Sequence, residues 1–409
     1  MCRAGKASPP DTELTDVTVT VVEKNMLSLK AETFVTSTGS EGGVETTATL
    51  NNAFGYTEKL SAAGSYGTAA ATAARVELLK PKLFGWPFSL TVGASNTTAT
   101  RAMYSSYDEK TQEVRVDLRH LGGRHELGVG SAWRDVLPAR SKINEFEFAA
   151  SGLIIAQAKP SLKNSMHYTF TADRRDDPHG PSQGSLLRAR AELAGFGGDA
   201  HFVKTQFAVQ QFARILKTVV PDCAVGFSFN AGALCPLPSL AGASSGAGAG
   251  AGAGSGSSAG DGGDKAGKAV GGSSFISDRF WLGGPMTLRG FNFKGAGPRT
   301  SPKRQGAEGG DSLGGDVFWS AGASLYLPFP HKLLHAAGMR CHLYANAGNL
   351  CAWETSARTL LQGARASVGA GLFFPTQIGR IEANYSYVLR ANSRDQVRRF
   401  QMGLGMDFL

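Results

Sequence analysis

The sequence of 409 residues contains no uninterrupted run of about 18 apolar residues, the length that a transmembrane helix needs. An ordinary membrane-spanning helix is therefore excluded, and a membrane protein of this composition has to cross with strands. Charge is scarce as well: 18% of the residues are charged and 42% hydrophobic, which excludes a disordered chain and allows one large barrel or core. The first residues, Met1–Lys6, run into a polar stretch without the apolar segment of a secretory signal, which favours a chain kept on the cytosolic side.

Cysteine is scarce and its spacing is uninformative. The five cysteines are odd in number and show neither C-x-x-C spacing nor histidines at zinc-like intervals, so we expect small buried side chains and no metal or redox site. The net charge of +9 comes from basic residues scattered along the chain, which disfavours a nucleic-acid partner. No Ser/His/Asp set, paired-carboxylate site or phosphate loop stands out, so we predict no enzymatic activity and no cofactor.

Glycine, in contrast, is abundant. The sequence has 53 glycines without a G-X-Y period, so turns, bends or a linker must account for them. Many lie in a Gly/Ala/Ser repeat at 241–272, which can bury little apolar surface. We predict that this repeat is a disordered insertion.

The dominant pattern is an alternation of apolar and polar residues. It is clearest at the C-terminus, where one set of positions is apolar: Phe400, Met402, Leu404, Met406 and Phe408. The intervening positions are polar or small: Arg399, Gln401, Gly403, Gly405 and Asp407. Such segments run well beyond the roughly 5–6 residues of soluble strands and match the roughly 9–11 that cross a bilayer. We therefore predict an all-β fold, a transmembrane antiparallel β-barrel, with apolar side chains toward lipid and polar ones toward the lumen.

The alternating segments number about sixteen. They are 26–38, 43–54, 57–66, 69–80, 86–98, 110–120, 123–133, 163–173, 184–195, 201–214, 221–234, 313–327, 339–350, 362–374, 379–390 and 396–409. Short joins between them favour antiparallel hairpins, because parallel strands need longer crossovers. Two stretches break the rhythm: 134–162, which we expect to form a plug-like or lateral element, and 235–312. The domain organisation predicted is a tail at 1–25 and a barrel at 26–409.

One motif directly follows the Gly/Ala/Ser repeat. It combines a D-R-F-x-L-G-G-P element, an R-G-F tripeptide and a later Gly297-Pro298. The residues that carry it are Asp278, Arg279, Gly283, Gly284, Pro285, Arg289, Gly290 and Phe291. This order strongly resembles the hallmark loop of the outer-membrane protein insertase family, also called the bacterial surface antigen family. The segment Leu343–Cys351, which contains N-A-G-N-L-C, is similar to the mitochondrial branch, the core subunit of the sorting and assembly machinery.

The resemblance implies that the R-G-F loop folds into the barrel. An arginine there needs a partner, because an isolated buried charge is expensive. Many relatives supply an aspartate on the strand that here carries Asn346, so this chain departs from the usual pairing. We consider three candidate partners for Arg289, namely Asp316, Glu382 and Asp407, and keep open that Arg289 is an ordinary solvated loop residue.

The end of the chain resembles the sorting signal of mitochondrial β-barrel proteins, which is a polar residue, a glycine and two apolar residues in the last strand. The matching residues are Gln401, Gly403, Met406 and Phe408. Relatives carry a soluble polypeptide-binding domain ahead of the barrel. Here Asp16–Lys24 is a candidate for its last strand, so 1–25 is either a tail or a remnant of such a domain.

The function implied by the resemblance is insertion and assembly of β-barrel precursor proteins into the mitochondrial outer membrane by strand templating at a lateral barrel seam. The implied partners are β-barrel precursors, membrane lipid and accessory subunits of an assembly complex. The alternative is a solute-conducting or protein-translocating outer-membrane pore of the plastid-envelope or bacterial kind. The R-G-F motif argues against a plain pore, which has no need for it.

Deleting Ala241–Gly272 is expected to leave barrel assembly nearly intact. The entropy of closing a flexible loop changes only slowly with its length, so shortening such a loop has little effect on stability. The measurement is the yield of assembled membrane-embedded protein compared with the full-length chain. Loss of assembly on this deletion would show that the repeat has a role beyond that of a tolerated insertion.

Overall fold

The structure is a computed structural model, and it describes most of the chain. The described residues are 2–5, 16–19, 25–35, 42–67, 71–140, 149–215, 223–238, 274–285, 287–300, 310–376 and 379–405. The repeat predicted to be disordered, 241–272, lies outside them, as do Phe146–Phe148, Met406, Asp407 and Phe408.

Strands dominate the described residues, and their lengths match the alternation in the sequence. The strands are β1 (Cys2–Gly5), β2 (Asp16–Val19), β3 (Leu27–Val35), β4 (Gly42–Asn51), β5 (Lys59–Gly67), β6 (Thr72–Lys80), β7 (Phe88–Thr100), β8 (Tyr107–His120), β9 (His125–Pro138), β10 (Ser161–Asp173), β11 (Gly184–Ala194), β12 (Phe202–Arg214), β13 (Ala224–Pro236), β14 (Val317–Pro328), β15 (Arg340–Cys351), β16 (Arg365–Thr376), β17 (Gly379–Arg390) and β18 (Phe400–Gly405). The helices are short: α1 (Gly152–Gln157), α2 (Lys332–Ala336), α3 (Ala357–Gln362) and the 3-10 helices η1 (Leu83–Gly85) and η3 (Ile276–Asp278). No helix in the described part of the chain is long and apolar enough to cross a membrane.

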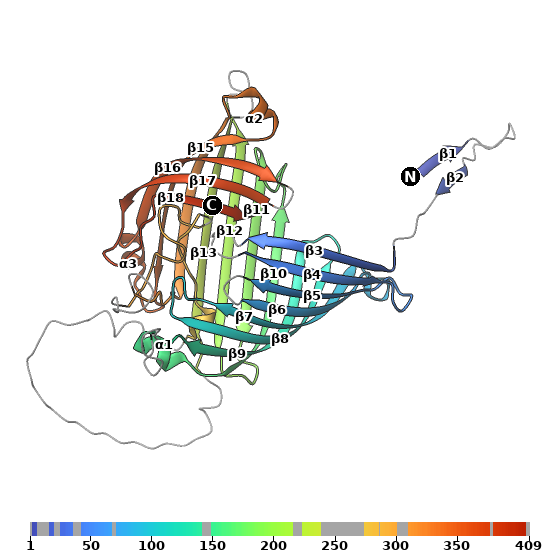
Figure 1. Ribbon diagram of the computed structural model, residues 1–409, viewed down its shortest axis with the longest axis horizontal. Helices are drawn as coiled ribbons and strands as arrows, with labels where there is room; N and C mark the ends of the chain where they lie inside the picture. The colour runs from blue at the N-terminus through green and yellow to red at the C-terminus, as the bar shows by residue number, and fades with distance from the viewer. Residues whose placement is uncertain are drawn as a thin grey trace, which may run out of the picture.

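Within the described ranges, β3 to β18 form one sixteen-stranded sheet in which spatial order follows chain order. Each pair of neighbours is antiparallel, from the β3–β4 hairpin to the pairing of β17 with β18. Figure 1 shows this progression from blue to red. Because every strand pairs with its chain neighbours, β3 and β18 are left as the two edges of the sheet. A separate small sheet pairs β1 with β2.

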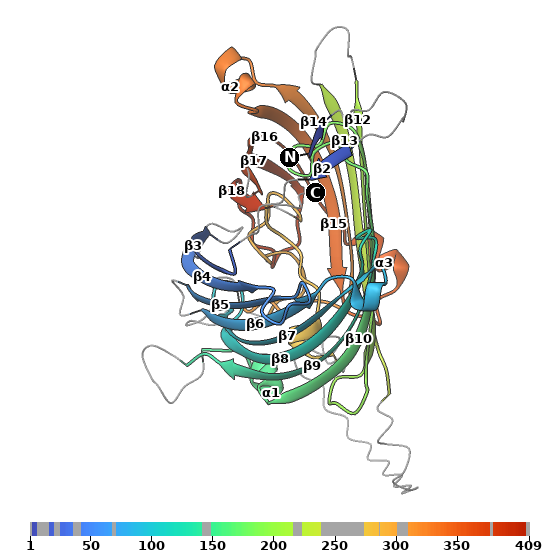
Figure 2. The ribbon, with the colours of Figure 1, turned by 90° about the vertical axis from the view of Figure 1, so that its right-hand side faces the viewer.

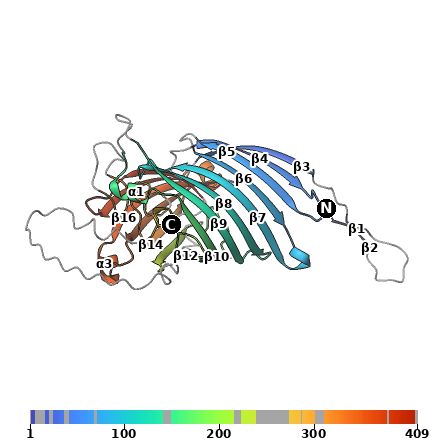
Figure 3. The ribbon, with the colours of Figure 1, turned by 90° about the horizontal axis from the view of Figure 1, so that it is seen from below.

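The sheet curves strongly, so that one face is concave. Figure 2 shows β3 to β6 and β16 to β18 on opposite sides of the concavity, with the yellow-orange segment near residues 274–300 between them. Seen from below, β3 to β10 run side by side as a tilted, twisted wall (Figure 3). The fold is therefore an antiparallel β-barrel with a seam between β3 and β18, as the alternation predicted. A long loop folds inward, as the family resemblance implied.

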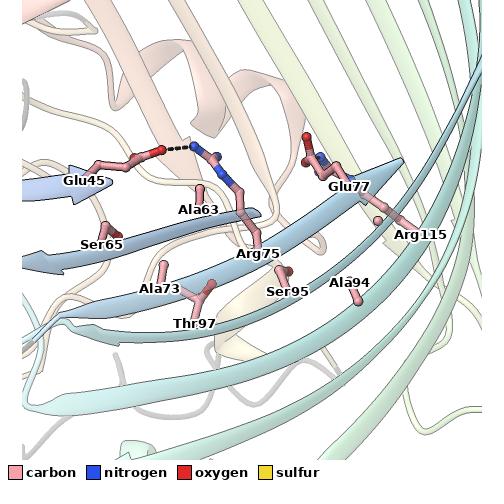
Figure 4. Close-up of a pocket in the computed structure, with 11 residues that line it drawn as sticks. Glu45, Ala63, Ser65, Ala73, Arg75, Glu77, Ala94, Ser95, Thr97 and Arg115 are labelled. Atoms are coloured by element: carbon pink, nitrogen blue, oxygen red, sulfur yellow. Dashed lines mark hydrogen bonds and ion pairs between the residues drawn. The ribbon is translucent and has the colours of Figure 1, made fainter. Parts of the chain in front are cut away.

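The two faces of the sheet have opposite chemistry. Outward positions carry exposed apolar side chains on many strands: Leu29, Val44, Tyr66, Val76, Val92, Val114, Val129, Phe207, Phe227, Leu343, Tyr385, Tyr387 and Met402. Inward positions carry polar ones, such as Glu45, which pairs with Arg75 on the inner wall (Figure 4). A water-soluble protein rarely exposes so continuous an apolar surface, whereas a barrel in lipid requires it.

The apolar core lies inside the concavity, between the inward loop and the wall. Phe280, Leu282, Leu288 and Phe291 of the loop form one buried cluster with wall residues that include Phe202, Leu234 and Leu350. The sheet alone has no second layer to pack against. The inward loop supplies that layer, and so it stabilises the C-terminal half of the wall.

The stretch 134–162 differs from the prediction in its extent. The first residues of this stretch belong to β9, which continues to Pro138, and its last residues belong to β10, which begins at Ser161. The insertion between the two strands is therefore shorter, and it contains helix α1. Ala150 and Ile154 are fully buried against Ile276 and Leu313 of the inward segment, so the described part of this insertion closes over the loop. The predicted strand 362–374 also began too early, because Gln362 ends helix α3 and β16 starts at Arg365.

A charge introduced on the outward face should destabilise the barrel far more than the same charge on the inward face. Val92 is exposed on the outer side of β7, whereas Thr97 of the same strand lines the inner wall beside Arg75. We expect Val92→Arg to lower the free energy of unfolding in lipid by about 2–4 kcal/mol, and Thr97→Arg by much less. Urea unfolding in lipid vesicles measures both. Equal effects would contradict the assignment of the faces.

Candidate functional site

The inward segment comprises the described residues 274–285, 287–300 and 310–313 and is called the inner loop here. Glycines allow its tight path. Gly283 has a φ of +112°, and a Cβ there would lie 2.5 Å from the carbonyl oxygen of Asn292. Gly290 of the R-G-F tripeptide has a φ of +88°, and its Cβ would lie 3.1 Å from Ser386 on β17. Both positions combine a left-handed backbone with close packing, so only glycine fits without strain. Gly284 also has a positive φ, of +114°, and Pro285 beside it is buried.

Arg289 is paired with a carboxylate on the inner wall. Its Nη2 atom lies 3.1 Å from Oε2 of Glu382 on β17, and the two side chains are 1% and 0% exposed. Its Nε atom also donates to the same oxygen, at 3.3 Å. Glu382 accepts two further hydrogen bonds, one from Arg380 and one of 2.8 Å from Asn384. This carboxylate is therefore the centre of a buried network that joins the inner loop to β17.

Arg289 makes further contacts on β15 and β16. Its guanidinium lies 4.9 Å from the ring centroid of Tyr344, within the range of a cation–π contact. Its carbonyl oxygen accepts a 2.6 Å hydrogen bond from Ser367, whose hydroxyl also contacts Oδ1 of Asn346 at 2.9 Å. Asn346 thus lies close to the loop but bonds to Ser367, while the negative charge comes from Glu382 on β17, two strands away in the sheet.

The last strand contacts the same loop through Gln401. Its side-chain oxygen accepts from the backbone N–H of Gly290 at 2.8 Å, and its amide nitrogen donates to the carbonyl of Phe291 at 2.6 Å. Just before β18, the N–H of Arg398 donates to the carbonyl of Gly290 at 2.9 Å. The R-G-F tripeptide is therefore bound to the backbone and side chains of the strand at the edge of the sheet.

Asp278 and Arg279 anchor the start of the inner loop elsewhere. Asp278 Oδ1 lies 2.7 Å from Nη1 of Arg134 on β9 and 3.5 Å from Nζ of Lys163 on β10. Lys163 in turn pairs with Glu192 of β11 at 2.6 Å. Arg279 donates to the hydroxyl of Ser274 at 3.0 Å and to the carbonyl of Leu313 at 3.1 Å. The loop is thus fastened to β9–β11 at one end and to β15–β18 at its tip.

The three candidate partners of Arg289 have different positions. Glu382 contacts it. Asp316 accepts a 2.7 Å hydrogen bond from Ser274, on the side of the loop where Arg279 lies. Asp407 lies outside the described residues, as do Met406 and Phe408 of the C-terminal signal. Gly403 of that signal is buried and lies opposite Glu382 in the β17–β18 register.

Lys294 is a residue that the sequence did not single out. Its ammonium lies 4.2 Å, 4.9 Å and 5.2 Å from the ring centroids of Tyr104, Trp281 and Phe293, and it donates to the Tyr104 hydroxyl at 2.9 Å. Burial lowers the pKa of Lys294 to about 7, helped by Arg101 and opposed by Glu109. Nothing in the local sequence signals this contact, because Tyr104 lies on the β7–β8 connection, far from Lys294 along the chain.

The pair between Arg289 and Glu382 should show strong energetic coupling. Breaking a buried pair strands the remaining charge and typically costs about 3–5 kcal/mol. We expect Glu382→Gln to lower the free energy of unfolding more than Arg289→Ala, because it leaves both Arg289 and Arg380 without their carboxylate. Urea unfolding of the double mutant should give a coupling well above the additive error of about 0.3–0.5 kcal/mol. Asp316→Asn is the control, and coupling of Arg289 to Asp316 instead would contradict the geometry.

Lys294 should make stability depend on pH. Below about pH 7 both folded and unfolded chains carry the proton; between the folded pKa of about 7 and the unfolded value near 10.4, the unfolded chain binds more protons. The free energy of unfolding should therefore rise with pH across this range. Lys294→Met should lack that rise. Urea unfolding of both proteins at about pH 6, 7.5 and 9 measures it, and parallel pH profiles would contradict the assignment.

Comparison with known proteins agrees with this architecture. A family model described as the Omp85 superfamily domain matches residues 52–408. A SAM50-like protein of Schizosaccharomyces pombe is 30% identical over 419 residues, covering 100% of this chain and 77% of the relative. The human sorting and assembly machinery component 50 homolog is 28% identical over 408 residues, covering 96% of this chain and 75% of the relative.

A solved structure has the same fold. The crystal structure of BamA from Haemophilus ducreyi lacking POTRA domains 1–3 superposes with a TM-score of 0.72, covering 99% of this chain and 74% of that one, at 15% sequence identity. That identity supports the barrel fold alone. The family model spans most of the sequence, including the inner loop and the strands that hold it, and the chain therefore belongs to the Omp85 superfamily.

Proposed function

We propose that the protein inserts and assembles β-barrel precursor proteins in the mitochondrial outer membrane. The observation that carries this proposal is the attachment of the inner loop to β18, an edge strand of an incompletely paired sheet. Relatives of similar sequence are named as components of a sorting and assembly machinery, which supports the same conclusion. Membrane lipid, precursor proteins and accessory subunits of an assembly complex are the proposed partners.

The mechanism follows from the chemistry of strand edges. The strands β3 and β18 end the sheet, and an edge strand offers N–H and C=O groups that pair with another strand. A precursor strand that pairs with such an edge enters lipid with its backbone groups satisfied, and each unsatisfied group there would cost several kcal/mol. Successive hairpins then add to the precursor without leaving a free edge in the hydrocarbon. No covalent chemistry is required.

The inner loop has a positioning role in this proposal. Gln401 holds β18 to the R-G-F tripeptide, and Arg289 holds the tripeptide to β17. The end of the sheet is thereby braced from inside while its other edge pairs with a precursor. Arg289, Gly290, Phe291, Gln401 and Gly403 are the residues to which we assign this role.

A solute-conducting or protein-translocating pore is the alternative function. The packing inside the barrel favours insertion, because Leu288 and Phe291 are fully buried and the loop fills the concavity with apolar contacts. A conducting pathway needs a hydrated lumen, and the loop occupies that space in the C-terminal half. Apolar contacts between the inner loop and the wall are also what the loop needs in order to brace the end of the sheet.

The test is assembly of a labelled β-barrel precursor by isolated mitochondria that carry only the variant protein. Arg289→Ala should slow assembly several-fold, while the protein itself stays in the membrane pellet after carbonate extraction, because its lipid-facing side chains are unchanged. Arg75→Ala is a matched control, since Arg75 forms a partly exposed ion pair with Glu45 on the inner wall, away from the loop. Assembly at the wild-type rate by Arg289→Ala would overturn the proposed role of the loop.

A further inference from the structure

A second cluster of polar groups lies on the inner wall, outside the site that holds the R-G-F tripeptide. Asp117 of β8, Glu126 of β9 and His167 of β10 come from three neighbouring strands, and one ligand atom of each lies within 4.8 Å of the other two. The register explains the meeting, because Gly128 is directly opposite both Asp117 and His167. Glu126 lies two residues before Gly128, so its side chain points to the same face.

The distances suit ligands of one metal ion. Nε2 of His167 is 3.6 Å from Oδ1 of Asp117 and 3.7 Å from Oε1 of Glu126. These separations exceed the 2.7–3.2 Å of an ordinary N–H···O hydrogen bond. They are close to the roughly 3.4 Å between ligand atoms on a tetrahedral zinc ion with bonds of about 2.0–2.1 Å. We propose that Asp117, Glu126 and His167 bind a divalent transition-metal ion, with Zn²⁺ as the best match.

Both carboxylates are oriented toward this point by arginines. Nε of Arg119 donates to Oε2 of Glu126 at 2.8 Å, and Nε of Arg115 lies 3.5 Å from Oδ2 of Asp117. The remaining oxygens, Oε1 of Glu126 and Oδ1 of Asp117, face His167. Oδ1 of Asp117 is buried without a hydrogen-bond partner among the described residues. Outer contacts of this kind fix ligand orientation in metal sites and leave the inner atoms free for the ion.

Gly128 keeps the space between these side chains open. A Cβ at this position would lie 2.2 Å from Oδ1 of Asp117 and 2.7 Å from Nε2 of His167. Any larger residue would therefore displace the ligand atoms. Gly130, the next inward position on the same strand, is different, because a Cβ there would meet nothing closer than 3.5 Å. The two glycines provide a matched pair of test positions.

The ion would have access from the barrel interior and would link three strands. Glu126 and Arg119 line a cavity of about 670 Å³ between the wall and the inner loop, which also contacts Trp281 and Thr287. A bound ion would hold β8, β9 and β10 together on their inner side.

This site is independent of the proposed insertion of precursors, so failure of either proposal leaves the other unaffected. Nothing in the sequence signals this site, because the three ligands lie on separate strands at long spacings.

The experiment is zinc titration of the purified full-length protein in detergent micelles, against a chromophoric competing chelator. The wild type should bind one Zn²⁺ per chain, and binding should weaken as pH falls, because histidine must be neutral to ligate. His167→Ala and Gly128→Ala should each weaken binding by at least about tenfold, the smallest loss typical even of outer-shell changes. Gly130→Ala should bind as the wild type does.

Two results would overturn the proposal. One is the absence of saturable zinc binding by the wild type, which would leave Asp117, Glu126 and His167 as polar neighbours on the inner wall without a metal-binding role. The other is equal affinity of Gly128→Ala and Gly130→Ala. If a variant loses its strand-rich circular dichroism spectrum, its affinity is no test. The visible absorption of Co²⁺ bound to the wild type then tests whether the three side chains bind a metal ion. A spectrum of tetrahedral nitrogen and oxygen ligation supports the site, and the spectrum of hydrated Co²⁺ excludes it.

Discussion

The buried carboxylate of Glu382 is the constraint on which the site depends. A charge without exposure has to be neutralised nearby, and here Arg289 arrives from the inner loop while Arg380 comes from the same strand. Because Arg289 lies at the tip of a long connection, its pairing determines where that connection lies. The apolar contacts of Leu288 and Phe291 with the wall follow from the same placement, since these residues flank Arg289 on the buried segment.

The placement of the tip connects the interior of the barrel to its seam. Gly290 and Phe291 offer one N–H and one C=O to the side chain of Gln401, and this pairing requires the left-handed backbone that Gly290 supplies. The strand β18 is thus held from within, at the edge where the sheet ends. The opposite end of the loop is fixed by the pairing of Asp278 with Arg134. The loop is therefore held at both ends and braces the edge strand from inside the barrel.

The sequence was informative where structure is local and uninformative where it depends on contacts between strands. Alternation at 379–390 predicts a strand, because the polarity of each residue indicates which face of the sheet its side chain is on. The strand β17 has these bounds. The same parity placed Glu382 inside the barrel and made it a candidate partner of Arg289. It did not distinguish Glu382 from Asp316, because that choice depends on how far the loop reaches across the wall. The ring contact of Lys294 with Tyr104 depends on where two loops meet, which no local pattern signals. The meeting of His167 with Asp117 depends on strand register, which alternation alone does not determine. The helices α2 and α3 are too short for a periodic signal.

The central claim is that the buried pair fastens the inner loop to the last strand, and amide hydrogen exchange measures this most directly. The Glu382→Gln protein in lipid nanodiscs should exchange faster than the wild type at 287–300 and at 396–405. Exchange in β7 (Phe88–Thr100), which is separated from β17 by nine strands in the sheet order, should stay unchanged. Unaltered protection of 396–405 in the variant would contradict the account, because the last strand would then be held independently of the loop.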